Sequence, residues 1–139
     1  LTGVQAVAPD VDAFLDAQLR ILGLPPSALA LVGFSQGTMT ALHVAPRRSP
    51  PLGAVVGFSG ALVGADLLPA ERRSAPPVLL VHGDRDDVVP VQALFGAIEA
   101  LGAAEVPVQW AIRPGLGHGI DPEGVDQAGR FLRAALTGR

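Results

Sequence analysis

Short apolar runs alternate along this chain with segments that carry apolar residues at helical spacing. Four runs are apolar at nearly every position, which is typical of strands buried on both faces of a parallel sheet. They are Ala28–Phe34, Leu52–Phe58, Val78–Val81 and Val106–Ile112. Strands of this kind need helices to cover both faces of the sheet. The alternation therefore predicts an α/β fold with about four parallel strands flanked by helices.

Helical spacing predicts the elements that cover this sheet. The expected helices span residues 10–22, 36–45 and 90–101, and a last one begins after residue 121. Pro90 fits the first helical position, Gly102 fits the position after the last, and Asp121 can cap the final helix. Residues 61–77, rich in Pro, Gly and charge, indicate a long loop or a loop with a short helix.

The same spacing predicts which helical side chains face the core. Phe14 and Leu22 share a face with the other apolar residues of their helix, Phe95 does so in the helix over 90–101, and Val125 does so in the last one. We find no internal repeat and no linker, so residues 1–139 are expected to form a single domain.

Composition excludes several classes of function. A net charge of −3 with only scattered Arg pairs gives no basic surface for nucleic acid. The absence of Cys excludes disulfides, thiolate catalysis and Cys-ligated zinc, and the absence of Lys excludes Schiff-base chemistry. No apolar run approaches the length of a membrane span. A nucleophile in this chain must therefore be an oxygen, or an amine that does not belong to a lysine side chain.

One motif joins a predicted strand to a predicted helix. Gly33-Phe34-Ser35-Gln36-Gly37 follows the first strand and opens the next helix. A strand-to-helix turn this sharp is expected to need small residues on both sides of the serine and to expose its side chain. The helix N-terminus offers the backbone N–H of Gln36 to a developing oxyanion. The motif predicts Ser35 as a nucleophile.

A serine hydroxyl needs a base and a group that orients the base. Asp84, Asp86 and Asp87 follow the third strand, and His118 lies in a glycine-rich loop after the fourth. The carboxyl ends of parallel strands meet at one edge of a sheet, so we expect these residues to converge on Ser35. The order Ser, Asp, His along the chain fits this architecture.

Two alternatives concern the acidic cluster and the base. The three aspartates could hold a metal, but no further carboxylate or His follows at ligand spacing, so we expect neither metal nor cofactor. His82 could replace His118 as base. It abuts a strand end only four residues from Asp86, which favours a structural role near the site.

Two further polar residues resemble site residues. Ser59 also ends a strand, but Ala61 replaces the second glycine of the motif and no capped helix follows, so we expect Ser59 to line the pocket. His43 falls inside the helix after Ser35, which favours a packing or surface role. We also expect Val88 to contact substrate.

Together these motifs resemble the phospholipase/carboxylesterase family of α/β-hydrolases, which includes acyl-protein thioesterases. The match runs through Gly23-Leu24-Pro25-Pro26-Ser27, Gly33-Phe34-Ser35-Gln36-Gly37, Phe58-Ser59-Gly60, His82-Gly83, Asp86, Val88-Val89-Pro90 and Gly117-His118. The resemblance implies that Ser35 is the nucleophile, Asp86 the orienting acid and His118 the base. Asp87 stands where the family often has Pro, and this departure leaves Asp86 aligned.

The resemblance also implies that elements are missing upstream of Leu1. Relatives begin with further strands and with a His-Gly loop that donates the second oxyanion N–H. We therefore expect the C-terminal portion of an α/β-hydrolase fold, and slow turnover, because one oxyanion donor is worth about 10²–10³ in rate. The strand over residues 28–34 would have a free edge, which we expect a second copy or a separate N-terminal piece to cover.

The sequence thus predicts a serine carboxylic-ester hydrolase of carboxylesterase, lysophospholipase or thioesterase type, acting on a small acyl ester or thioester through an acyl-enzyme. Because an imidazole base must be unprotonated, activity is expected to fall below about pH 6–7. A cytoplasmic location is expected. The alternative is a catalytically weak or inactive fragment that serves as an interaction or assembly module.

Overall fold

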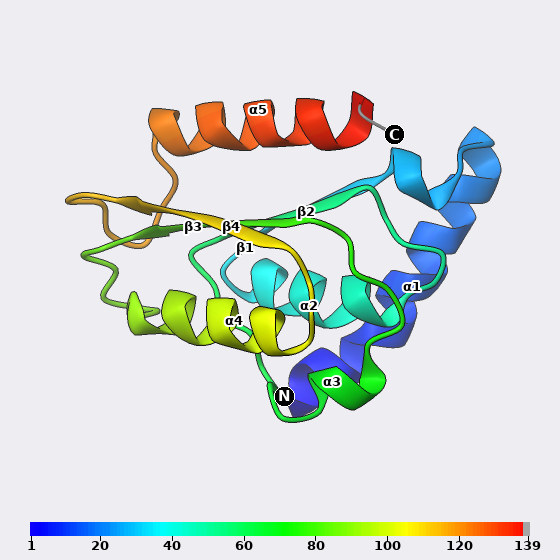
Figure 1. Cartoon of the computed structure of the whole chain (residues 1–139), viewed down its shortest axis with the longest axis horizontal. Coiled ribbons are helices and arrows are strands. Elements are labelled where there is room, and N and C mark those ends of the chain that lie inside the picture. The colour runs from blue at the N-terminus through cyan, green and yellow to red at the C-terminus, as the bar shows by residue number, and fades with distance from the viewer. Residues whose placement is uncertain (138–139) are drawn as a thin grey trace.

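The computed structural model describes residues 1–137 and contains one sheet of four parallel strands in the order β1-β2-β3-β4 (Figure 1). The strands are β1 (Ala30–Phe34), β2 (Ala54–Phe58), β3 (Val78–Gly83) and β4 (Val108–Arg113). The helices are α1 (Thr2–Leu22), α2 (Gln36–Val44), α3 (Leu68–Glu71), α4 (Gln92–Ala103) and α5 (Pro122–Thr137), with short 3₁₀ turns at Pro26–Ala28 and Ala45–Arg47. The predicted α/β class and its four strands are confirmed.

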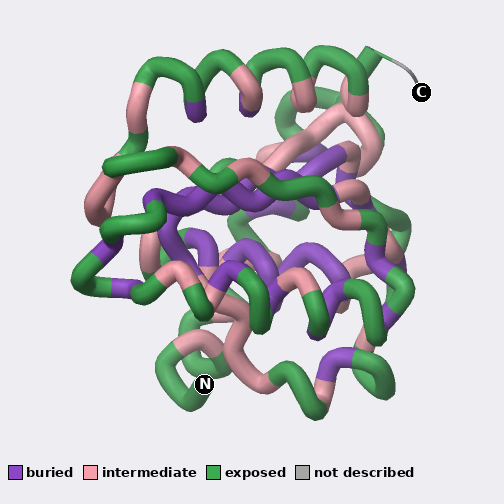
Figure 2. The backbone as a smooth tube through the Cα atoms, turned by 60° about the vertical axis from the view of Figure 1, so that its left-hand side comes forward, coloured by how far each residue is buried: buried purple, intermediate pink, exposed green. Residues whose placement is uncertain are grey.

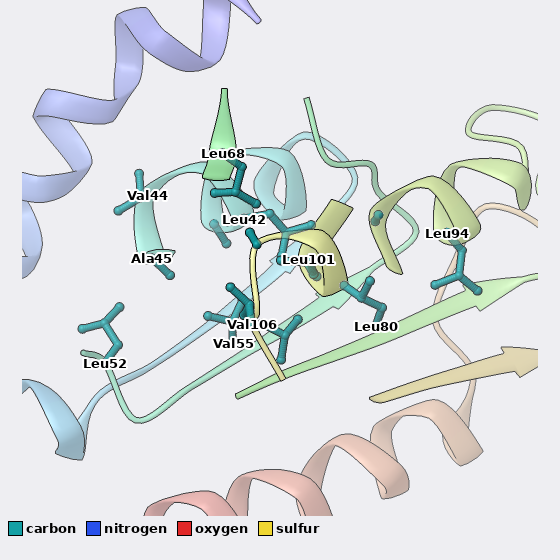
Figure 3. Close-up of a cluster of buried hydrophobic side chains, with 14 of the residues drawn as sticks. Leu42, Val44, Ala45, Leu52, Val55, Leu68, Leu80, Leu94, Leu101 and Val106 are labelled. Atoms are coloured by element: carbon teal, nitrogen blue, oxygen red, sulfur yellow. The ribbon is translucent and has the colours of Figure 1, made fainter. Parts of the chain in front are cut away.

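Helices cover both faces of this sheet. Helices α2 and α4 lie on one face and α5 lies on the other, while α1 packs against α2 (Figure 1). The larger core cluster fills the space between the sheet and α2 and α4, where Leu42, Leu94 and Leu101 gather over Leu80 (Figure 3). A smaller cluster under α5 includes Phe58 and Ala128. The arrangement holds the carboxyl ends of all four strands in one row.

Burial differs between the inner and the outer strands. Every residue of β2 and β3 is buried, and these strands form the buried centre in Figure 2. Strands β1 and β4 lie at the edges, where Val32 of β1 is 59% exposed and Trp110 of β4 is 51% exposed. The expectation of strands buried on both faces therefore holds for the inner pair only, because α5 packs mainly on β2 and β3 and leaves the edge strands less covered.

Three helix boundaries bear on the predictions. Helix α1 begins at Thr2 and continues through Pro9, because Ala8 and Val11 on either side of the proline both pack against the core. Helix α4 extends past Gly102 to Ala103, so Gly102 is not its terminating residue. The cap of α5 is as predicted, since Oδ1 of Asp121 accepts the N–H of Gly124 at 2.8 Å.

Four apolar side chains predicted to face the core are exposed instead. Phe14 and Leu22 of α1 are each 61% exposed, Phe95 of α4 is 49% exposed, and Val125 of α5 is 58% exposed. Successive helical residues point about 100° apart, so Val125 points away while its neighbour Gly124 faces the sheet. The apolar stripe of each helix is thus wider than the strip that its neighbours bury. Within residues 1–137, no helix is both long and apolar enough to cross a bilayer.

Small residues let α2 approach the sheet closely. A Cβ atom at Gly57 would lie 2.6 Å from Cγ2 of Thr38, and one at Gly60 would lie 2.4 Å from its Cβ. Oγ1 of Thr38 donates a hydrogen bond of 2.8 Å to the carbonyl of Phe58. The first turn of α2 is therefore seated directly on the ends of β1 and β2.

Candidate active site

Ser35 stands between β1 and α2 in a backbone conformation that L-residues rarely adopt. Its φ is 55°, and its N–H donates to the carbonyl of Phe58 at 2.9 Å. Gln36 follows in the first turn of α2, where a backbone N–H has no acceptor within the helix. The sharp turn predicted from the sequence is present, and it leaves the N–H of Gln36 free of the helix's own bonding.

Only one side of this turn is crowded. A Cβ atom at Gly33 would lie 2.5 Å from the backbone carbon of Gly37 and 2.6 Å from the nitrogen of Thr38. A Cβ atom at Gly37 would meet nothing within 4 Å. The expectation that both glycines prevent a clash is therefore wrong for Gly37, because its Cα–H points away from β1 and not into it.

His118 links Ser35 to Asp86. Its Nε2 lies 3.1 Å from Oγ of Ser35, and its Nδ1 lies 2.8 Å from Oδ2 of Asp86. An ionised carboxylate can only accept, so Nδ1 carries the proton and Nε2 accepts from the serine hydroxyl. The ring of Phe34 lies 4.9 Å from the imidazole, centroid to centroid, with the planes tilted by 40°. The structure thus brings together the three side chains singled out by sequence.

Asp86 is fully enclosed, with no exposed side-chain area. Its Oδ1 accepts the N–H groups of Val88 at 2.9 Å and Val89 at 2.8 Å. Burial opposes ionisation of this carboxyl, but the hydrogen bonds from His118, Val89 and Val88 outweigh it and hold the pKa of Asp86 below its ordinary value. The carboxylate is therefore charged at neutral pH and faces the imidazole.

The loop that carries His118 is fixed on both sides of the histidine. Gly115, at φ 73°, donates its N–H to Oδ1 of Asp84 at 2.8 Å. On the other side, Oγ of Ser59 donates to the carbonyl of Gly119 at 3.1 Å. These two contacts tie the loop after β4 to the ends of β3 and β2. They hold the imidazole at the edge where Ser35 stands.

The remaining predicted site residues take different positions. Val88 is 64% exposed next to Asp86, and Ser59 is 1% exposed with its hydroxyl bonded to Gly119. Substrate contacts by Val88 and Ser59 stay predictions. Asp84 braces the His118 loop, and Asp87 is exposed. Among residues 1–137, no three His, Asp or Glu side chains are placed to share a metal ion.

The two strands that meet at the site carry nearly the same sequence, which the search for internal repeats did not reveal. Residues 30–35 and 54–59 match at five of six positions, and β1 and β2 pair these positions in register. Ser35 and Ser59 consequently end their strands with nearly the same φ, 55° and 52°. The two serines differ in their partners, because Ser35 contacts an imidazole and Ser59 contacts a carbonyl. The repeat of Val-Gly-Phe-Ser in the sequence is the signal that pairs Ser59 with Ser35.

A largely apolar cavity of about 460 Å³ opens beside this turn. Gln36, Gly37 and Met39 of α2 form one wall, and the first residues of α1 form the other. The cavity is therefore lined in part by Gln36, whose N–H has no acceptor within α2.

Comparison with known proteins identifies a family and several relatives of this chain. Residues 2–136 match the phospholipase/carboxylesterase family. Acyl-protein thioesterase 1 of Gibberella zeae is 33% identical over 119 residues, which cover 82% of this chain and 51% of that protein. Esterase YpfH of Escherichia coli is 32% identical over 114 residues, which cover 82% of this chain and 48% of that protein.

Comparison with solved structures also finds an esterase of similar fold. The crystal structure of esterase PE8 matches with a TM-score of 0.94 at 44% identity, covering 98% of this chain and 63% of that chain. The chain spans about half the length of the curated relatives it matches. The family match, the relatives and the fold together establish that the chain belongs to the phospholipase/carboxylesterase family of α/β-hydrolases.

Proposed function

We propose that this chain hydrolyses carboxylic esters or thioesters, with Ser35 as nucleophile. The observation that carries the proposal is the unbroken hydrogen-bond chain from Oγ of Ser35 through His118 to the buried carboxylate of Asp86. A serine hydroxyl placed this way loses its proton to the imidazole as it attacks.

The proposed reaction proceeds through an acyl-enzyme. Nε2 of His118 takes the hydroxyl proton while Oγ of Ser35 bonds to the acyl carbon, and Asp86 stabilises the resulting imidazolium. The N–H of Gln36 donates to the oxyanion. The alcohol or thiol then leaves with the proton from His118. Water repeats the attack with the same proton transfers and releases the carboxylic acid, which regenerates Ser35.

The acyl group is proposed to be short or of medium length. The cavity beside Gln36 is lined mainly by apolar side chains such as Val4, Val7 and Met39, which suit an alkyl chain. One relative is named an acyl-protein thioesterase and another an esterase, so both leaving groups are considered.

Turnover is expected to be slow. Within residues 1–137, the oxyanion donor that we identify is the N–H of Gln36, at the start of α2. An oxyanion is usually bound by two donors, and the lack of one typically lowers turnover by about 10²–10³.

The test compares an oxygen ester and a thioester with the same acyl chain. Ser35→Ala is expected to lower hydrolysis of both to the rate without protein, whereas Ser49→Ala, on the exposed surface, retains the rate of the parent chain. The ratio of the two rates assigns the leaving-group preference. Equal hydrolysis by the parent chain and Ser35→Ala contradicts the proposal.

The second candidate function, an interaction or assembly module, is favoured by the exposed edge of β1. Val32 and Phe34 are 59% and 41% exposed there, and within residues 1–137 the strand pairs with β2 alone. Apolar edges of this kind pair with other chains. Concentration-dependent association that Val32→Lys abolishes would support this function, and a monomer at all concentrations would contradict it.

A further inference from the structure

His82 is a buried histidine that the proposed reaction does not use. It is the residue before the last of β3, with its side chain 2% exposed, and its Nε2 lies 2.8 Å from the carbonyl oxygen of Val89. A carbonyl can only accept, so Nε2 of His82 carries the proton and donates. The same nitrogen lies 3.5 Å from Oδ2 of Asp86. His82 therefore directs an N–H into the space between Val89 and the carboxylate.

This N–H supports Asp86 indirectly, through Val89. The carboxylate takes the N–H groups of Val88 and Val89 on Oδ1 and the N–H of His118 on Oδ2. Val89 is held twice, since its N–H donates to Asp86 and its carbonyl accepts from His82. His82 thus fastens the turn that supplies donors to the carboxylate. No side-chain area of Asp86 is exposed, so water cannot replace a donor that is lost.

We propose that His82 is a positioning residue for the proposed hydrolysis. It fixes the turn from Asp86 to Val89 and, through the carboxylate, the orientation of His118. This inference rests on the proposed function of Ser35. His82 is not the base in this proposal, because its donating nitrogen bonds to the carbonyl of Val89 and the hydroxyl of Ser35 bonds to His118.

The groups around this pair define what can influence it. His118 is the titratable side chain that bonds to Asp86 beside His82, and Phe34 packs on His118. Helices α2 and α4 contribute uncharged residues to the small cavity that His82 also lines, namely Thr38, Leu42, Leu94 and Ala97. A change at His82 therefore acts on the carboxylate and, through it, on the His118 imidazole.

Removing the donor has a predictable effect on catalysis. Without the His82 N–H the carbonyl of Val89 loses its partner, and the turn that directs the N–H groups of Val88 and Val89 at Oδ1 of Asp86 loosens. The carboxylate then orients His118 less well, which lowers kcat by about tenfold for one hydrogen bond of ordinary strength and leaves KM nearly unchanged.

The test uses His82→Leu, which cannot donate, and His82→Gln, whose side-chain amide can donate to Val89. Rates are expressed per active site, counted by titration with a fluorophosphonate, so that unfolded protein does not contribute. His82→Leu is expected to lower kcat about tenfold with little change in KM, and His82→Gln is expected to restore kcat. Wild-type kcat per site in His82→Leu overturns the proposal, as does equal impairment of the two variants.

A second readout separates this proposal from the reaction itself. The ring resonances of His118, followed by NMR at one pH, report on its contact with Asp86 without any turnover. If the parent chain is inactive and Ser35 is not labelled, the proposed hydrolysis fails. The positioning role of His82 still holds if the His118 ring resonances move in His82→Leu and return in His82→Gln. Unchanged resonances in His82→Leu overturn it.

Discussion

Replacing Gly33 by alanine tests how closely α2 must approach β1 for the nucleophile to be placed. The new Cβ atom would lie 2.5 Å from the backbone carbon of Gly37, about 0.9 Å short of an ordinary contact of 3.4 Å. The three nearest atoms all belong to the backbone of Gly37 and Thr38, so no rotamer change can relieve the overlap. The first turn of α2 must shift, and Ser35 and Gln36 must shift with it.

The size of the effect follows from this overlap. Overpacking of a well-packed site costs about 1–3 kcal/mol, and an overlap with three backbone atoms places Gly33→Ala at the upper end, near 3 kcal/mol. A displacement of about 1 Å at the reacting groups lowers the rate by about 10². We therefore expect a lower urea midpoint and fluorophosphonate labelling of Ser35 that is about 10²-fold slower.

Gly37→Ala is the matched control, because it changes the other glycine of the same motif. Its Cβ would meet nothing within 4 Å, and replacing Gly by Ala inside a helix stabilises by about 0.5–1 kcal/mol. Urea unfolding followed by circular dichroism should therefore place Gly37→Ala at or above the parent chain and Gly33→Ala well below it. Equal midpoints for the two variants would refute the steric reasoning.

Two further predictions concern the supports of His118 and Asp86. Ser59→Ala leaves the carbonyl of Gly119 without its donor, so it should lower the free energy of unfolding by about 1–2 kcal/mol and speed amide hydrogen exchange in residues 115–119. The control is Ser74→Ala, which removes a buried serine contact of 3.4 Å elsewhere and should not speed exchange in residues 115–119. Faster loop exchange in both variants would contradict it. Because the folded pKa of Asp86 lies below its ordinary 3.8, its stabilisation is present above that value and is lost as pH falls through the folded pKa. The free energy of unfolding should therefore drop as the pH falls below about 4 in the parent chain and drop less in Asp86→Asn, and identical pH dependence would contradict the assignment.

Local pattern was sufficient for the features that depend on neighbouring residues. Four apolar runs became four strands, and the Gly33–Gly37 motif became a strand-to-helix turn with Ser35 at positive φ. The meeting of Ser35, Asp86 and His118 followed from one topological rule, that parallel strands end at the same edge.

Features that depend on packing between distant segments were not predictable. The hydroxyl of Ser59 bonds to a carbonyl 60 positions away, and no local signal announces that contact. The open space beside Gly37 depends on the direction in which its Cα–H points in the fold. The continuation of α1 through Pro9 depends on the core contacts of Ala8 and Val11. Each of these outcomes is decided by tertiary contacts that override local preference.

The most direct measurement of the central claim is to locate the serine that a fluorophosphonate modifies. Ser35 and Ser59 end adjacent, nearly identical strands with φ values of 55° and 52°, so they form an internal comparison in which only Ser35 faces an imidazole. Peptide mass spectrometry is expected to find the phosphonyl group on Ser35, none on Ser59, and greatly slowed labelling in His118→Ala. Modification of Ser59, or no modification of Ser35 in the folded chain, would contradict the account.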